Sequence, residues 1–397
     1  MNTKIAQRFI VAGMIGYVIF GIFRFSISVV LPDIQKQFVL NETEAGALMS
    51  LLLLASLVTM NLTSHLSNRI GRRYVMTFGL FSSSLGMLLL GLANSYYISL
   101  IAAFLSGLGV GFISPSIYGL VGEMSPKSRG FLAGLINAFY GSIGGFLGPL
   151  LSGIMISQYD WRFPLCIFGA FSFLTVASFW FLSKDLSLGR TSKANDERSY
   201  VKMLCSRPIL VACASMFAAY FGFTVFSTWT PSFLFRERGF DPIQTGTVYG
   251  TWVFMSGMGA VVLGWLSDKH DRRLVIFVSA LVNTFVAFIF YSYVMAFIPA
   301  VIFSIPFGFA GGAFWSLSIS LVQDAVDPLA IVSATALVQS VGLLGGIAGP
   351  VVSATLFDFM GLTGALITCV SISYFIHGIL ILAARKPKQQ VTNNIDS

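Results

Sequence analysis

The sequence has 397 residues, of which 56% are hydrophobic and only 10% are charged. One soluble core cannot enclose that share of apolar side chains, so the composition excludes an ordinary soluble domain and indicates a chain that uses lipid as its solvent. The formal charge of +8 comes from basic residues spread over short loops. This spread excludes the single basic patch of a nucleic-acid-binding protein.

Twelve apolar segments are long enough to cross about 30 Å of hydrocarbon at about 1.5 Å per residue. We therefore predict an all-α membrane protein with twelve transmembrane helices in two six-helix bundles. The first segment follows a short basic stretch, as in a signal peptide, but its apolar run is too long and no clear cleavage site follows. The predicted helices cover residues 8–31, 43–64, 74–94, 97–122, 130–157, 161–183, 208–235, 243–266, 274–295, 298–322, 331–357 and 362–384.

Residues 184–207 form the one long hydrophilic interruption of the sequence. They separate an N-terminal six-helix bundle, residues 1–183, from a C-terminal bundle with a short tail, residues 208–397. A run of mixed charge is typical of a solvated tether, and a regulatory role stays open.

Basic residues predict the orientation of the chain. Nineteen Lys and Arg residues fall on the loops of one side of the predicted membrane, and four fall on the other side. Because positive residues concentrate on the cytoplasmic side, both termini and the linker are expected there. We predict a multi-pass protein of the cell membrane, either a plasma membrane or a bacterial inner membrane.

Two patterns repeat at half the chain length. Leu66–Arg73 (LSNRIGRR) returns as Leu266–Arg273 (LSDKHDRR), with four of eight positions identical. Gly144–Pro149 (GGFLGP) returns 201 residues later as Gly345–Pro350 (GGIAGP). Glycines permit close helix contact and proline invites a bend, so packing and hinge roles both fit the second repeat. A duplicated hydrophobic bundle is typical of secondary transporters.

These repeats and the six-plus-six arrangement resemble the major facilitator superfamily over essentially the whole chain. The two basic turns are similar to the family's loop between the second and third helices of each half, and residues 123–130 are similar to its loop after the fourth helix. The resemblance implies that these loops form a cytoplasmic latch. The gating residues it implies are Asn68, Arg69, Arg72, Arg73, Glu123, Arg129, Asp268, Lys269, Arg272 and Arg273.

Asn68 stands where the family usually has an aspartate. It keeps a hydrogen bond but loses the charge, so we expect the first latch to be weaker than the second. The alternative is that the charges of both turns only set the membrane topology.

Arg24 is the one charged residue that falls well inside a predicted membrane helix. It lies sixteen residues, or about 24 Å, along the first helix from Arg8. A charge within the bilayer is costly, so Arg24 must face a partner or a water-filled cavity. Its planar fork suits a carboxylate or phosphate, which predicts an anionic substrate. The alternative is a structural arginine that bonds backbone carbonyls or extends to the membrane surface.

The resemblance leaves the coupling mechanism open. Ala103 stands where proton-coupled antiporters of the family often have an arginine. Residues 24–33 are similar to the first helix of the organic anion symporter branch, yet Phe23 replaces a carboxylate common there. A uniporter, an anion exchanger and a symporter whose proton travels on the substrate all fit this pattern.

Other polar residues share the predicted helices. Tyr17, Gly21 and Ser28 fall on the Arg24 face of the first helix. In the family, helices one, four, seven and ten line the central cavity. Polar residues on membrane helices also hold helices together, so each of these has a structural alternative. The candidate substrate residues are Arg24, Tyr17, Ser28, Tyr118, Asn137, Tyr140, Tyr220, Thr224, Thr228, Trp315 and Gln339.

Several features have a structural interpretation. Asn41 begins a glycosylation sequon, but Asn41 and Glu44 also make a helix-capping box, which we prefer. His377 is expected to bond a neighbouring helix. The four cysteines are interpreted as small apolar fillers, without a metal site or a disulfide framework. Because no phosphate loop, nucleophile elbow or metal cluster is apparent, we expect no cofactor and no enzymatic activity.

We therefore predict a secondary transporter that moves a small organic anion by alternating access of two six-helix halves. It is expected to act as a monomer, with the lipid bilayer and a small molecule as its partners. One alternative is an efflux antiporter for hydrophobic drugs or metabolites, favoured by the fifth helix and the many aromatic residues. The other is a membrane sensor that binds a ligand without transporting it.

Overall fold

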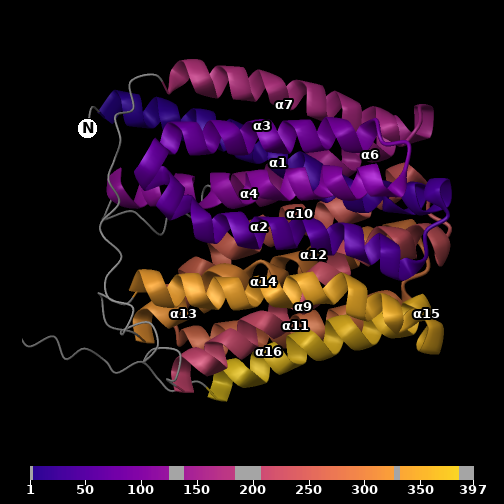
Figure 1. The fold of residues 1–397 in the computed structure, drawn as a ribbon. Coiled ribbons are helices and arrows are strands. Elements are labelled where there is room, and N and C mark those ends of the chain that lie inside the picture. Colours follow the sequence, from indigo (N-terminus) through magenta and orange to yellow (C-terminus); the bar gives the residue numbers. More distant parts are fainter. Residues whose placement is uncertain (1–2, 125–137, 184–206, 326–330, 384–397) are drawn as a thin grey trace, which may run out of the picture.

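The structure is a computed structural model, which describes residues 3–124, 138–183, 207–325 and 331–383. These residues form two groups of helices that lie side by side (Figure 1). The first group contains α1 (Thr3–Phe38), α2 (Glu42–Ile70), α3 (Arg72–Gly91), α4 (Tyr96–Met124), η2 (Phe139–Gly144), α6 (Gly145–Gln158) and α7 (Arg162–Leu182). The second contains α9 (Arg207–Arg236), α10 (Pro242–Lys269), α11 (Arg272–Tyr293), α12 (Phe297–Gly311), α13 (Ala313–Ala325), α14 (Ile331–Thr355), α15 (Phe357–Leu366), η4 (Ile367–Ser371) and α16 (Ile372–Ala383).

The described residues contain twelve segments long and apolar enough to cross a membrane, as predicted. Three of these segments are not single α-helices. The fifth combines η2 with α6, the tenth combines α12 with α13, and the twelfth combines α15, η4 and α16. Large apolar side chains such as Leu174, Phe285 and Ile302 are more than half exposed on the outer surface. An apolar surface of this kind requires lipid as its solvent.

Matching caps begin the second helix of each half. The Asn41 side chain accepts from the Glu44 amide at 2.8 Å, and the Glu44 carboxylate accepts from the Asn41 amide at 2.8 Å. Asp241 and Gln244 repeat this arrangement at α10. The capping box predicted at Asn41 is thus confirmed, and the duplication extends to the polar details of the helix ends.

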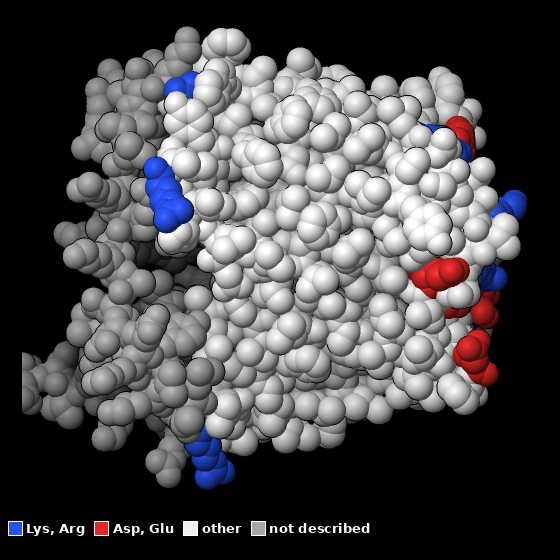
Figure 2. All heavy atoms as spheres, in the orientation of Figure 1, with Lys and Arg blue, Asp and Glu red and all other residues white. Residues whose placement is uncertain are grey.

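The charged side chains gather at the two ends of the bundle. In Figure 2 the visible acidic side chains lie at the end drawn on the right. We call this the acidic end; its charged residues are Asp33, Lys36, Glu42, Glu44, Asp160, Arg162, Arg236, Glu237, Arg238, Asp241 and Asp358. The opposite end we call the basic end; its described charged residues include Arg69, Arg72, Arg73, Arg207, Asp268, Lys269, Asp271, Arg272 and Arg273.

The two halves meet mainly through two helix pairs, α2 with α14 and α6 with α10, and α1 also contacts α9. The prolines of the glycine–proline repeat take part in both of the main contacts. A Cβ atom at Gly246 would lie 2.3 Å from the Pro149 carbonyl oxygen, and one at Gly46 would lie 2.7 Å from the Pro350 carbonyl oxygen. These distances are too short for a side chain, so only glycine lets the backbones approach this closely. The prolines of the repeat therefore lie at the contact between the halves. The glycines Gly148 and Gly345 of the repeat instead pack within their own halves, against the backbone carbonyls of Ile22 and Phe217.

Candidate functional site

Arg24 lies on α1, and its side chain is buried with 5% relative exposure. One of its terminal nitrogens, Nη1, is fully buried and has no hydrogen-bond partner in the described structure. No carboxylate among the described residues forms an ion pair with it. A buried guanidinium without an opposite charge is energetically unfavourable.

Three tyrosines lie within electrostatic range of this charge. Arg24 interacts electrostatically with the hydroxyl groups of Tyr140, Tyr220 and Tyr249. Tyr140 comes from η2 in the first half, whereas Tyr220 on α9 and Tyr249 on α10 come from the second half. Arg24 therefore lies where the two halves meet, and polar groups of both halves face it.

The α1 face predicted from helical spacing packs mainly against η2. Tyr17 stacks on Tyr140, with ring centroids 4.4 Å apart and planes 20° apart. A Cβ atom at Gly21 would lie 2.5 Å from the Tyr140 carbonyl oxygen. Ser28 is fully buried beside the Tyr249 hydroxyl. Tyr17 thus supports Tyr140, while Arg24 and Ser28 face the second half.

The three polar residues predicted on the seventh helix, Tyr220, Thr224 and Thr228, lie in three different environments. The Tyr220 ring lies 5.1 Å from the Trp315 ring, so α9 and α13 present these two aromatic residues together. The Thr224 hydroxyl donates to the Tyr220 carbonyl at 3.0 Å and packs against Gly349 of α14, as expected of a residue that holds two helices together. Thr228 is fully buried and its hydroxyl has no partner in the described structure.

Tyr249 was missed by the sequence reasoning. It donates a hydrogen bond to the Ser227 carbonyl at 2.8 Å and is fully buried. The resemblance implied that helices one, four, seven and ten line the central cavity, and α10 is the eighth membrane-spanning helix. Gly246 and Gly250 on either side of Tyr249 could have indicated that this part of α10 meets the other half.

Several predicted residues cannot be placed in the site. Gln339 on α14 is partly buried. Asn137 and Arg129, together with linker residues 184–206, lie outside the described residues. Tyr118 and Glu123 on α4 and Asn68 on α2 have side chains outside the described set. His377 is buried and its Nδ1 lies 2.7 Å from the Ser215 hydroxyl of α9, so the predicted bond to a neighbouring helix is confirmed.

The two basic turns differ in their contacts. In the second turn, Arg272 pairs with Asp268 at 3.0 Å, Arg273 pairs with Asp271 at 2.9 Å, and Asp271 caps α11. Lys269 lies 3.8 Å above the Trp265 ring. The second turn is therefore held by ion pairs within itself.

In the first turn, Gly71 takes the place of Asp271 and adopts a φ of 95°, which favours glycine. Arg73 donates to the Trp180 carbonyl at 2.8 Å and lies 4.0 Å above the Trp180 ring, and this contact ties the turn to α7. Arg72 is buried and Arg69 is exposed. The first turn is thus anchored to its own half through Trp180.

An ion-pair network crosses between the halves at the acidic end. Arg236 of α9 pairs with Glu42 of α2 at 2.5 Å and donates to the Gln35 side chain of α1 at 2.7 Å. Gln35 in turn donates to Glu42 at 2.8 Å. Figure 2 shows a hollow between the halves at the opposite, basic end. The two halves are thus closed against each other at the acidic end.

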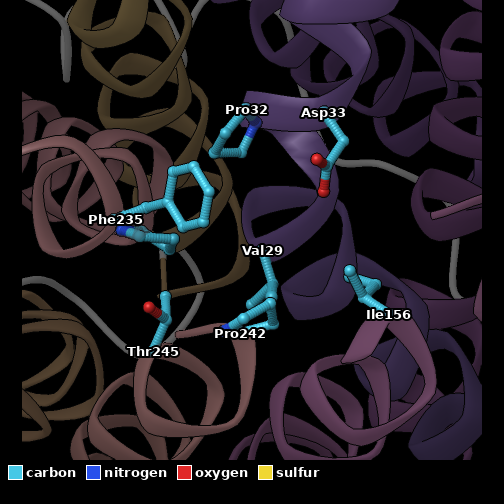
Figure 3. Close-up of a pocket in the computed structure, with 8 residues that line it drawn as sticks. Val29, Pro32, Asp33, Ile156, Phe235, Pro242 and Thr245 are labelled. Atoms are coloured by element: carbon cyan, nitrogen blue, oxygen red, sulfur yellow. The ribbon is translucent and has the colours of Figure 1, made fainter. Parts of the chain in front are cut away.

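A small cavity lies near this network, between α1 and α6 of the first half and α9 and α10 of the second (Figure 3). It has a volume of about 10 Å³, which is the room that one water molecule needs. Asp33 and Thr245 are the polar side chains that line it. Neither residue was a candidate in the sequence analysis.

A family model described as Major Facilitator Superfamily matches residues 13–350 and 236–396. An uncharacterized transporter of Buchnera aphidicola subsp. Acyrthosiphon pisum (strain APS) is 32% identical over 184 residues, 45% of this chain and 43% of that protein. The chain therefore matches less than half the length of that relative. Monocarboxylate transporter 13 of Rattus norvegicus is 25% identical over 303 residues, 75% of this chain and 70% of that protein.

Other relatives are named for drug resistance. The fosmidomycin resistance protein of Escherichia coli (strain K12) is 26% identical over 262 residues, 64% of this chain and 63% of that protein. Among solved structures, a bacterial homolog of the human lysosomal transporter Spinster, in an inward-facing and unoccupied conformation, gives a TM-score of 0.79 at 16% identity. The match covers 97% of this chain and 96% of that one, and it shows a shared fold.

Proposed function

Because the chain belongs to the Major Facilitator Superfamily, we propose that it carries a small organic anion across the cell membrane by alternating access of its two halves. The observation that carries the proposal is Arg24, a buried guanidinium whose Nη1 has no partner in the described structure. A carboxylate would supply the missing charge and accept the unused hydrogen bonds. The relative named as a monocarboxylate transporter agrees with this substrate class.

The surroundings of Arg24 support a ligand that touches both halves. The hydroxyl groups of Tyr140 from the first half and Tyr220 from the second can donate to the same anion. Contact with both halves is what alternating access requires, because the ligand must favour their movement around it. The positive-inside rule further assigns the basic end to the cytoplasm, with both termini on that side.

The burial of Arg24 without a partner also predicts how Arg24→Gln changes the stability of the protein. Without an anion, the variant should be more stable than the wild type, by about 1–3 kcal/mol, because it removes a buried and unsatisfied group. The wild type should instead gain stability from the right anion, by about 2.7 kcal/mol at one hundred times its dissociation constant. The variant should lose this gain.

Thermal unfolding of the purified protein with a panel of carboxylates and phosphate esters tests both parts, with Arg162→Gln at the acidic end as the matched control. Uptake of the stabilising anion into proteoliposomes then tests transport. Anion stabilisation that survives in Arg24→Gln would contradict the proposal.

A second function is favoured by the relative named for fosmidomycin resistance and by the aromatic residues around Tyr220. As an exporter of hydrophobic compounds, the protein would be stabilised by lipophilic cations equally in wild type and Arg24→Gln. The same panel therefore distinguishes the two functions when a lipophilic cation is included.

A further inference from the structure

The cavity at the acidic end holds a carboxylate that the proposed transport cycle has not yet used. Asp33 lines it from α1, and Thr245 lines it from α10 in the other half (Figure 3). Pro242 and Phe235 complete the wall on the side of the second half. The cavity therefore exists only while the two halves are closed against each other at this end.

Asp33 differs from Glu42, Glu44 and Asp160 in having no partner among the described residues. Glu42 pairs with Arg236 and Asp160 pairs with Arg162, while Glu44 caps α2. Within the described residues, no hydrogen bond or ion pair is found for the Asp33 carboxylate. The chain thus places an unpaired carboxylate against apolar side chains of the opposite half.

Thr245 lines the cavity on the side opposite Asp33 (Figure 3). Its side chain is 2% exposed, and its hydroxyl has no hydrogen-bond partner in the described structure. The cavity can hold a single water, which could accept a hydrogen bond from a protonated Asp33. An ionised Asp33 could only accept.

The charges around Asp33 act in opposite directions. Asp160 repels the carboxylate, and Lys36 attracts it. The cavity walls from α6, α9 and α10 add apolar side chains and the neutral Thr245 hydroxyl. Burial against these walls disfavours the charged form, and separation of the halves would return the carboxylate to water.

We propose that Asp33 is a proton-binding site, and that binding of one proton from water favours the arrangement closed at the acidic end. The proposal rests on the alternating access proposed above. If the acidic end faces the outside, external acid would close that side and favour the cytoplasm-facing arrangement. No metal is needed, and the described residues contain no group of three or more potential metal ligands.

The test measures closure directly and without a substrate. Spin labels at Tyr97 and Phe359, two exposed positions at the acidic end in different halves, report the distance between the halves in a variant whose native cysteines are replaced. As the pH falls from about 8 to about 5, the ratio of closed to open molecules should rise, by at most about tenfold per pH unit for one proton. The sign follows because the closed state binds the additional proton.

Asp33→Asn should remove the pH response and hold the ratio near the acidic value, whereas Asp33→Glu should keep the response. The matched control is Asp358→Asn, an exposed acidic residue on α15, which should respond like the wild type.

Two results would overturn the site: a wild-type ratio that does not change with pH, or an unchanged response in Asp33→Asn. If either result is found and an anion still changes the distance between the spin labels, the transport proposal stands and the Asp33 proposal does not. A single distance under every pH and anion condition would contradict alternating access itself, and with it both proposals.

Discussion

The α6–α10 and α2–α14 contacts between the halves each join a glycine to a proline carbonyl, but the side chains beside them differ. At the α6–α10 contact, Gly246 meets the Pro149 carbonyl, and at the α2–α14 contact, Gly46 meets the Pro350 carbonyl. Beside α2 lies the Arg236 network, whereas beside α10 lies the Asp33 cavity. Duplication thus supplied the backbone contact, and later divergence gave one side an ion pair and the other a carboxylate without a partner.

The largest expected effect comes from filling the glycine contacts. Gly246→Ala should reduce the free energy of unfolding by about 1–3 kcal/mol, because the new methyl group would meet a backbone oxygen that cannot turn aside. Gly46→Ala should cost less, since its distance to the facing oxygen is longer. Chemical or thermal unfolding measures both. Gly264→Ala on α10 is the control, because nothing lies within 4 Å of a Cβ atom there. An equal loss in the control would show that α10 responds to any added methyl group.

A smaller effect is expected from a hydrogen bond that crosses between the halves at the α2–α14 contact. Ser50 of α2 donates to the Ile347 carbonyl at 2.6 Å, whereas the matching residue of α10 is Gly250, which has no donor in its side chain. Ser50→Ala should cost about 0.5–1.5 kcal/mol in the free energy of unfolding. Thr247→Ala serves as the control, since its exposed hydroxyl bonds only to the Ile243 carbonyl of its own helix. Equal losses in the two variants would show that Ser50 contributes nothing to the contact between halves.

The smallest effect is expected from the ion pair itself. Both partners are about one-third exposed, so the coupling energy between Arg236 and Glu42 should be about 0.2–1 kcal/mol and should weaken in high salt. A double-mutant cycle with Arg236→Gln and Glu42→Gln measures it. In the spin-label experiment these variants should open the acidic end, whereas Arg162→Gln breaks a pair within one half and should not. Opening by Arg162→Gln to the same degree would remove any special role for the network.

The sequence predicted the helices well, because membrane spans depend on apolar length and the caps depend on local residues. Arg24 could be found for the same reason, since a lone charge in an apolar segment is visible without a fold. The residues that surround Arg24 could not be found from the sequence. Tyr249 and Arg24 are more than two hundred residues apart, and only the packing of α1 against α9 and α10 brings them together.

The Asp33 cavity shows the same limit, because the sequence does not reveal which distant residues meet. Asp33 follows Pro32 near the end of α1. A charged residue at a membrane surface is common there and does not indicate a functional site. The place of Asp33 in the cavity depends on Thr245 and Phe235 of the other half. Spacing along one helix also could not distinguish the residues of α9, where Thr224 packs against Gly349 and Thr228 has no partner in the described structure.

The paired glycine and proline contacts have a consequence for how such a chain could originate. Each half carries both members, a glycine on its second helix and a proline on its fifth, and each member meets the other kind in the opposite half. A contact in which residue i meets j while j meets i is the isologous contact of a twofold-symmetric homodimer. A free six-helix subunit with this glycine and proline could therefore dimerise with its own copy through two identical contacts. Fusion of two such subunits would then permit the differences between the two sides, because a homodimer must change both contacts at once.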